Sequence, residues 1–452
     1  MLKLQVSHYI VYSFIGLFCF TGCVDRKASN ESETDWVSLA IASEKHIRQA
    51  KYRSDAGISW KQMPDSLNSE GNKTLYSGTP GIVLFYLELF HATNDSVYLN
   101  EAKSGADYLI NSLKDTTPNV YEMGLYTGLA GIGFTLTELF KMTNDDIYAK
   151  AALKTITLLE SASEQSENGI HWGQLSDIVY GSAGIGLYLH YIADELQSEK
   201  ADSLSIRVAE GLLDTTIDTL GRLRWKFHPE DDRYMDNFSH GTSGVAYFLV
   251  KAYQRTKHTE YLDAALRAAI LLDTLANDKG YIPHHLPGGE TLYYLSWCHG
   301  PPGTSRLYYA LYEATKDKLW LTKIIHSANH LMEEGIVMRE KPGFWNNAGK
   351  CCGITGVAEY YLWLYHITGT KDYLRFSETM TENVLKKSTR DGDLLKWIHA
   401  EHRRSPGQVA AQTGLMQGTA GMGLWFLQLY AHQHNTTPLI TLPDTPESNT
   451  QK

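Results

Sequence analysis

Cysteine is scarce in this sequence, and its distribution argues against a disulfide-stabilised fold. Five of the 452 residues are cysteine, and two of them, Cys19 and Cys23, lie within the first 23 residues. The remaining three are Cys298, Cys351 and Cys352. An odd number gives no disulfide framework, and adjacent cysteines bridge poorly because the bond strains the peptide between them. We therefore expect free thiols that serve either a core or a chemical role.

The sequence also lacks a basic stripe of the kind that binds nucleic acid. Acidic residues outnumber basic ones by 51 to 41, which gives a formal net charge of −10 at pH 7. This balance excludes nucleic acid as an expected partner. Strand-like alternation is scarce as well, while a hydrophobic fraction of 43% suffices for a large core. The composition therefore favours an all-α globular protein.

The apolar run at the N-terminus is too short to span a bilayer comfortably. The stretch 9–20 ends in the sequence FTGC, which places small residues before Cys23. This order is typical of a signal peptide and is similar to the lipobox of bacterial lipoproteins. We expect 1–23 to be a lipoprotein signal peptide with Cys23 lipidated, and 24–34 to be a polar tether. The protein would then be anchored on the extracytoplasmic side of a membrane in the bacterial cell envelope. The alternative is a buried N-terminal helix with an incidental cysteine.

One glycine motif, by contrast, is abundant. Gly-x-x-Gly occurs seven times, and an apolar run with helical periodicity follows each copy. Successive first glycines are 50, 53, 60, 59, 53 and 65 residues apart. The copies begin at Gly78, Gly128, Gly181, Gly241, Gly300, Gly353 and Gly418. Repetition at such a period predicts structural units that each bury an apolar face against the next.

Two kinds of helix alternate along this repeat. The runs after the glycines, such as 80–90, are apolar on nearly all sides, which is typical of buried inner helices. The segments between them, such as 96–113, are amphipathic and more polar. Seven inner helices ringed by seven outer ones satisfy this pattern, so we expect an α/α toroid over 35–434. An open α-solenoid is the alternative. The tail 435–452, rich in Thr and Pro, is expected to be disordered.

The three cysteines beyond the N-terminal segment stand just before glycine motifs of neighbouring repeats. Inner helices that run the same way bring their N-termini to one end of the toroid, where helix dipoles favour thiolates. Cys298, Cys351 and Cys352 should therefore face one another. Three soft ligands with an open fourth position predict one catalytic Zn²⁺. Three inert buried thiols are the alternative, and His299 is a competing ligand if Cys351 points away.

The motifs WCHGPPG, CCGITG and SHGTSG together resemble the lanthionine synthetase C-like family, which includes bacterial lanthipeptide cyclases. The resemblance covers roughly 35–434 and includes all seven glycine motifs. It implies a toroid that holds one zinc ion through Cys298, Cys351 and Cys352. Family cyclases add a peptide thiol to dehydroalanine or dehydrobutyrine. The expected substrate is therefore a peptide or a small thiol, and the expected activity is thioether formation. A separate dehydratase is a potential partner, since this chain has no dehydratase half.

The resemblance also implies acid–base residues. His240 matches the catalytic histidine of the family, and Asp177 resembles the acidic residue that assists it. His299 occupies a position that is Tyr or His among family cyclases, which implies a polar role in the active site. Thiol addition leaves an enolate, so such a site must supply a proton.

One departure from the family pattern concerns substrate anchoring. Some cyclases carry an arginine four residues before the first zinc cysteine, where this chain has Tyr294. His284-His285 and Arg403-Arg404 are the loop residues that could compensate, and the alternative is that these basic pairs are simply solvated. The departure keeps open a non-catalytic, zinc-containing binding or scaffold lipoprotein.

A carbohydrate-active α/α toroid is the remaining alternative. Such an enzyme needs paired carboxylates, for which Asp231, Asp232 and Asp236 are the candidates. A cluster on one loop is more typical of a solvated turn, and glycoside hydrolysis gives no reason for three cysteines in register.

Overall fold

The inner helices begin at the glycine motifs, as the sequence predicts. The computed structural model describes residues 34–65, 70–113, 119–335, 347–400 and 404–446. Within these ranges the first glycine of each motif is the N-cap of a helix of 14 or 15 residues. These inner helices are α2 (Thr79–Thr93), α4 (Leu129–Thr143), α6 (Ser182–Glu195), α8 (Thr242–Thr256), α10 (Pro301–Thr315), α12 (Ile354–Thr368) and α14 (Thr419–Gln433).

The outer helices alternate with the inner ones along the chain. They are α1 (Trp36–Gln49), α3 (Ser96–Ser112), α5 (Asp146–Ser161), α7 (Glu199–Asp214), α9 (Thr259–Leu275), α11 (Leu319–Glu333) and α13 (Lys371–Lys386). Polar residues stand at the junctions between inner and outer helices. Asn94 ends α2 in the left-handed region at φ 54°, and the side chain of Asp95 then accepts a hydrogen bond from Val97 N at the start of α3.

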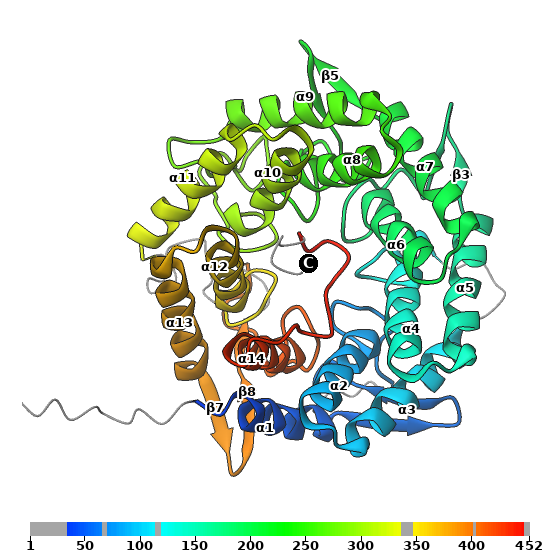
Figure 1. Ribbon diagram of the computed structural model, residues 1–452, viewed down its shortest axis with the longest axis vertical. Helices are drawn as coiled ribbons and strands as arrows, with labels where there is room; N and C mark the ends of the chain where they lie inside the picture. Colours follow the sequence, from blue (N-terminus) through cyan, green and yellow to red (C-terminus); the bar gives the residue numbers. More distant parts are fainter. Residues whose placement is uncertain (1–33, 66–69, 114–118, 336–346, 401–403, 447–452) are drawn as a thin grey trace, which may run out of the picture. The chain divides into compact units, whose positions relative to one another are not determined.

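The seven inner helices contact one another in a closed circle. Each contacts the next inner helix along the chain, and α14 contacts α2. Each inner helix packs most extensively on the outer helix that follows it, whereas α14 packs on α1, the first helix of the chain (Figure 1). The predicted all-α toroid is therefore confirmed, and α1 supplies the outer layer at the junction between the last repeat and the first.

A circuit of backbone hydrogen bonds lines the end of the ring at which the inner helices begin. The bonded residues stand two or three positions before the first glycines of the motifs. The bonds run from Tyr76 N to Tyr126 O, Tyr126 N to Val179 O, Ile178 N to Ser239 O, Ser239 N to Cys298 O, Cys298 N to Cys351 O, Cys351 N to Met416 O, and Met416 N to Tyr76 O, at 2.8–3.3 Å. We call this circuit the loop ring. Because Cys298 and Cys351 are neighbours in it, the circuit fixes the register between the cysteine-bearing loops.

The second glycine of each motif is required by close approach rather than by an unusual backbone conformation. A Cβ atom at Gly131 would lie 2.3 Å from the carbonyl oxygen of Leu125, and one at Gly303 would lie 2.1 Å from that of Trp297. No real Cβ contact is so short. Glycine therefore lets each inner helix start directly against its own loop.

Strands occur only as short antiparallel pairs among the described residues. They are β1 (Lys51–Ser54) with β2 (Gly57–Trp60), β3 (Glu164–Gln165) with β4 (Ile170–His171), β5 (Ile217–Thr219) with β6 (Arg222–Arg224), β7 (Ser388–Asp391) with β8 (Leu394–Trp397), and β9 (His399–Ala400) with β10 (Val409–Ala410). A short 3-10 helix, η1 (Val120–Glu122), precedes α4. None of the helices in the described ranges has both the length and the apolar character needed to cross a bilayer.

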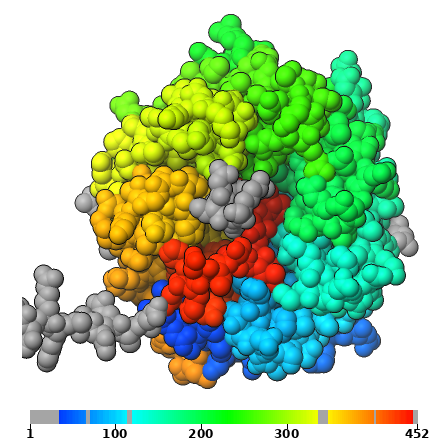
Figure 2. Space-filling view, in the orientation of Figure 1, coloured from blue at the N-terminus to red at the C-terminus, as the bar shows by residue number. Residues whose placement is uncertain are grey.

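The C-terminal tail differs from the sequence-based expectation. The sequence predicts disorder over 435–452, but residues 435–446 are ordered and turn back into the middle of the ring (Figures 1 and 2). The backbone N–H groups of Leu439 and Ile440 donate to the buried carboxylate of Glu88, at 3.1 and 2.7 Å. The prediction rested on the polar composition of the tail. It was wrong for 435–446 because a few apolar side chains and fixed hydrogen-bond partners suffice to order the segment. Residues 447–452 lie outside the described part.

The N-terminal residues Met1–Thr34 form a separate unit from Asp35–Lys452. Of this unit only Thr34 is described. The predicted signal peptide over 1–23, Cys23 and the tether over 24–34 therefore lie outside the described residues, apart from Thr34.

Candidate active site

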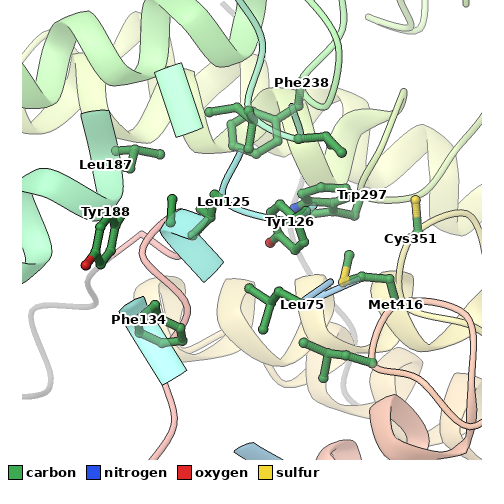
Figure 3. Close-up of a cluster of buried hydrophobic side chains, with 14 of the residues drawn as sticks. Leu75, Leu125, Tyr126, Phe134, Leu187, Tyr188, Phe238, Trp297, Cys351 and Met416 are labelled. Atoms are coloured by element: carbon green, nitrogen blue, oxygen red, sulfur yellow. The ribbon is translucent and has the colours of Figure 1, made fainter. Parts of the chain in front are cut away.

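The three cysteines meet where the loops before α10 and α12 join the loop ring. The Sγ atoms of Cys298 and Cys352 lie 3.2 Å apart, and those of Cys351 and Cys352 lie 3.5 Å apart. All three sulfurs lie within 4.8 Å of one another, and all three residues are buried. Their thiols are free. The predicted convergence of these residues is confirmed, and Figure 3 shows Cys351 beside Met416, its hydrogen-bonded neighbour in the loop ring.

The cluster fits a thiolate-binding metal ion. Sulfurs about 2.3 Å from a tetrahedral zinc ion lie roughly 3.8 Å apart, close to the separations observed here. The electrostatics of the cluster also favour a negative charge that the three cysteines share. Burial raises the pKa of Cys298, whereas hydrogen bonds from Cys298, Cys352 and Tyr76 outweigh the burial of Cys351 and hold its pKa well below the usual value. A metal cation would stabilise the remaining thiolates in this buried place.

His299 does not join the cysteine cluster in the part of the chain that the structure describes. Its side chain is buried, and its Nε2 lies 3.5 Å from Ser239 Oγ. Its ring stacks on that of His284, with centroids 4.0 Å apart, and lies 5.8 Å from that of His240. The geometry therefore favours the three-cysteine set over a ligand set that includes His299, and it places His299 near both His240 and His284.

His240 and Asp177 form a hydrogen-bonded pair at the same end of the ring. Nδ1 of His240 lies 2.7 Å from Oδ2 of Asp177, whose other oxygen accepts from Tyr180 N at 3.0 Å. Asp177 has no exposed surface, whereas the His240 side chain is 24% exposed. A buried carboxylate at Nδ1 fixes a protonated Nδ1 and leaves Nε2 as the nitrogen available for proton exchange. His240 follows Ser239, whose N–H donates to the carbonyl of Cys298, so the pair adjoins the cysteine cluster.

Aromatic side chains that the sequence analysis did not single out enclose His240. The ring of Tyr180 stacks on the imidazole at 5.9 Å, and that of Phe227 meets it edge-on at 5.0 Å.

Tyr76 is another residue of the site that the sequence did not lead us to expect. Burial raises its pKa well above the usual value, Cys351 contributes further, and its hydroxyl accepts from Gln417 Nε2 at 3.1 Å. The signal for Tyr76 was its register, since it stands two residues before Gly78 just as Cys351 stands two before Gly353.

The position of Tyr294 bears on the missing arginine. Its ring lies 4.5 Å from that of His284 and 5.9 Å from that of His299. Nδ1 of His284 is in turn 3.0 Å from Nδ1 of His285. The loop that carries both histidines thus reaches the candidate site. Arg404 is exposed, and Arg403 lies outside the described residues.

Two of the three carboxylates considered for glycoside hydrolysis have other partners. Asp236 is buried, forms an ion pair with Arg224 and accepts from Thr242 Oγ1 at 2.7 Å. A hydrogen bond from Arg233 lowers the pKa of Asp231 to about 2. Asp232 is exposed. The ion pairs of Asp236 and Asp231 explain these two residues as structural, and neither is placed as one of a catalytic pair.

Comparison with known proteins agrees with the fold. The model of the lanthionine synthetase C-like protein family matches residues 69–442, so the chain belongs to this family. Among solved structures, nisin cyclase matches with a TM-score of 0.64 and 19% identity, over 89% of this chain and 94% of its own. An alpha-1,6-mannanase from Salegentibacter sp. matches with a TM-score of 0.47 and 14% identity, over 88% and 99% of the two chains. At these identities the match to nisin cyclase supports the fold alone.

Proposed function

We propose that this chain is a zinc-dependent, thioether-forming cyclase. It would add a thiol to a dehydroamino acid, or to a similar electrophile, in a peptide substrate. Family membership supports a cyclase-like function. The observation that carries the proposal is that two groups of reactive side chains lie on adjacent loops of the loop ring. One is the cluster of three thiols, and the other is the His240–Asp177 pair.

Cys298, Cys351 and Cys352 would hold the metal ion and leave a fourth position open to the substrate. When bound, zinc lowers the pKa of a substrate thiol, so that its thiolate exists near neutral pH. The cysteines occupy a buried site at the beginning of the inner helices, where few water molecules compete for the ion. Three thiolate ligands also keep the centre electron-rich, which preserves the nucleophilicity of the substrate sulfur.

His240 would deliver the proton that completes the addition. A new bond forms between the substrate sulfur and Cβ of the dehydroamino acid, while the Cα–Cβ π electrons move into an enolate. Protonation at Cα then gives the saturated thioether. The carboxylate of Asp177 orients the imidazole through Nδ1, so Nε2 is the proton donor.

The test uses a synthetic peptide that contains one cysteine and one dehydroalanine. Cyclisation consumes the thiol without changing the mass, so subsequent alkylation distinguishes the cyclised peptide from the linear one by mass spectrometry. We expect one zinc ion per chain and catalysed thiol loss for the wild type. His240→Gln should retain zinc and lose activity, and Cys298→Ala should lose both.

The control is Asp231→Asn, a conservative change at a partly exposed carboxylate paired with Arg233. It should behave as the wild type in both assays. Freshly reduced protein without zinc, or a His240→Gln variant with the full rate, would contradict the proposal. Retained zinc without activity on dehydrated peptides would instead favour a binding or scaffold protein.

We also propose that the protein acts in the cell envelope, anchored through a lipid on Cys23. The support is the sequence of the first 34 residues alone. The test is fractionation of cells that produce the full chain or its Cys23→Ser variant. The wild type should sediment with membranes, and the variant should not. Equal distribution of the two would contradict the anchor.

A further inference from the structure

A buried carboxylate from the C-terminal tail lies directly behind the cysteine-bearing loop. Asp444 has no exposed surface, and it lies two residues beyond the end of the family match. Its Oδ2 accepts a hydrogen bond from Trp297 Nε1 at 3.0 Å, and its Oδ1 accepts from the hydroxyl of Tyr126, also at 3.0 Å. Arg306 of α10 forms an ion pair with the same carboxylate, with its Nη1 3.1 Å from Oδ2. A single side chain thus ties together two loops of the ring and the first turns of α10.

Trp297 is the residue immediately before Cys298, so its orientation bears directly on the cysteine. Its indole packs against the rings of Tyr126 and Phe238, with centroids 5.1 and 5.9 Å away (Figure 3). The same peptide segment exchanges backbone hydrogen bonds with both neighbouring loops, through Cys298 N and Cys298 O. The indole N–H is the polar end of this otherwise apolar anchor, and Asp444 is its acceptor.

We propose that Asp444 is a positioning residue for the metal centre. By holding the Trp297 indole and Arg306, it keeps Cys298 in the orientation at which its sulfur meets those of Cys351 and Cys352. The tail over 435–446 then supports the site from inside the ring, through Asp444. This inference rests on the proposed metal site for its consequence. The positioning itself concerns residues of this chain and is measurable without metal.

Two measurements test the proposal, one with metal and one without it. In the first, the affinity for zinc is measured by competition with a chromophoric chelator, and Co²⁺ is bound in parallel to record its thiolate charge-transfer band. We expect Asp444→Asn to weaken zinc binding about 10-fold, as is typical when an outer-shell partner is lost, and to change the cobalt spectrum. In the second, the metal-free protein is treated with iodoacetamide. Cys298, which is almost fully buried, should be alkylated several-fold faster in the variant.

A second variant guards against simple misfolding. Asp444→Asn removes the carboxylate that forms an ion pair with the partly buried Arg306, which can destabilise the whole chain. Trp297→Phe removes the indole donor and keeps the ion pair. It should shift both readouts in the same direction. The effects of the two changes should add to less than their sum in the double variant, because both act on the contact between Trp297 and Asp444.

The matched control is Glu88→Gln, which changes another buried carboxylate that binds the same tail, at Leu439 and Ile440. It should leave the zinc affinity and the alkylation rate of Cys298 close to those of the wild type. An equal effect of Glu88→Gln would overturn the specific role of Asp444, and so would an unchanged Cys298 in folded Asp444→Asn protein. Wild-type protein that binds no zinc would refute the proposed function, while the alkylation measurement would still decide whether Asp444 positions Cys298.

Discussion

Nδ1 of His240 lies 2.7 Å from Oδ2 of Asp177, a carboxylate with no exposed surface. The two residues are 63 positions apart in sequence and come from the loops before α8 and α6. Since Tyr180 N also donates to Asp177, the carboxylate is held in place on both oxygens. The histidine is the more exposed member of the pair, with 24% of its side chain exposed. Its orientation therefore depends on a buried partner that its own hydrogen bonds hold in place.

The first prediction concerns that partner. Asp177→Asn keeps a hydrogen-bonding side chain at the same place but removes the negative charge that faces Nδ1 of His240. We expect kcat for cyclisation to fall by about 10- to 100-fold, with zinc content unchanged, because general acid–base catalysis contributes on the order of 10²- to 10⁴-fold in total. An unchanged rate would remove Asp177 from the mechanism.

The second prediction concerns metal removal. The sulfurs of Cys298 and Cys352 are 3.2 Å apart, so the metal-free protein should form a disulfide between them when treated with diamide. Two thiols per chain would be lost, as measured with a thiol reagent, and peptide mapping would identify the pair. Zinc-loaded protein should resist the same treatment because its thiolates are occupied. Equal oxidation of both forms would argue against metal at these residues.

The third prediction concerns the glycine motif. A methyl group at Gly131 would lie 2.3 Å from the carbonyl oxygen of Leu125 and 3.0 Å from Cβ of Leu75. Gly131→Ala should therefore lower the free energy of unfolding by at least about 2 kcal/mol, through backbone displacement. Urea denaturation measures the change. Gly407→Ala is the control, because nothing lies within 4 Å of a Cβ atom at that position, and it should be nearly neutral.

The fourth prediction concerns the carboxylate that receives the tail. Burial raises the pKa of Glu88 from 4.5 to about 7, against the opposing effect of its hydrogen bonds from Ile440 and Leu439. Between these two pH values the folded protein retains a proton that the unfolded chain has lost. The free energy of unfolding should therefore decrease as pH rises from about 4.5 to about 7, by roughly 3 kcal/mol from this group, and then level off.

Glu88→Gln removes the titrating group and serves as its own control for this effect. The difference between the wild-type and variant free energies of unfolding should fall between about pH 4.5 and about pH 7 and be nearly constant outside this range. Denaturation at a series of pH values provides both curves. Parallel curves across this range would show that Glu88 does not titrate near neutral pH in the folded protein.

Several features of the candidate site could be predicted from local sequence. Each inner helix begins at its glycine motif because glycine permits close contact between the start of the helix and the loop before it. This requirement involves only residues that are near one another in sequence. Cys298, Cys351 and Cys352 stand at or next to the same register in that motif, which was enough to predict that they meet. The identity of His240 and Asp177 as a pair came from resemblance, since nothing in their spacing indicates a contact.

Three other features could not be read from the sequence, because each depends on contacts between distant segments. The packing of α1 on α14 and the hydrogen bond from Met416 to Tyr76 exist only when the ring closes. The tail has the composition of a disordered segment, yet Glu88 and the residues around Asp444 order it.

The sequence by itself thus determined the helices, their number per repeat and the end of the ring at which the chemistry gathers. Periodicity and register are local properties that survive in any arrangement of the chain. Only the tertiary structure decided how the ring closes, which residues enclose His240, and where the tail goes. Burial of Asp444 between Trp297 and Arg306 is favourable only after those groups have been brought together, because an isolated carboxylate is far more stable in water.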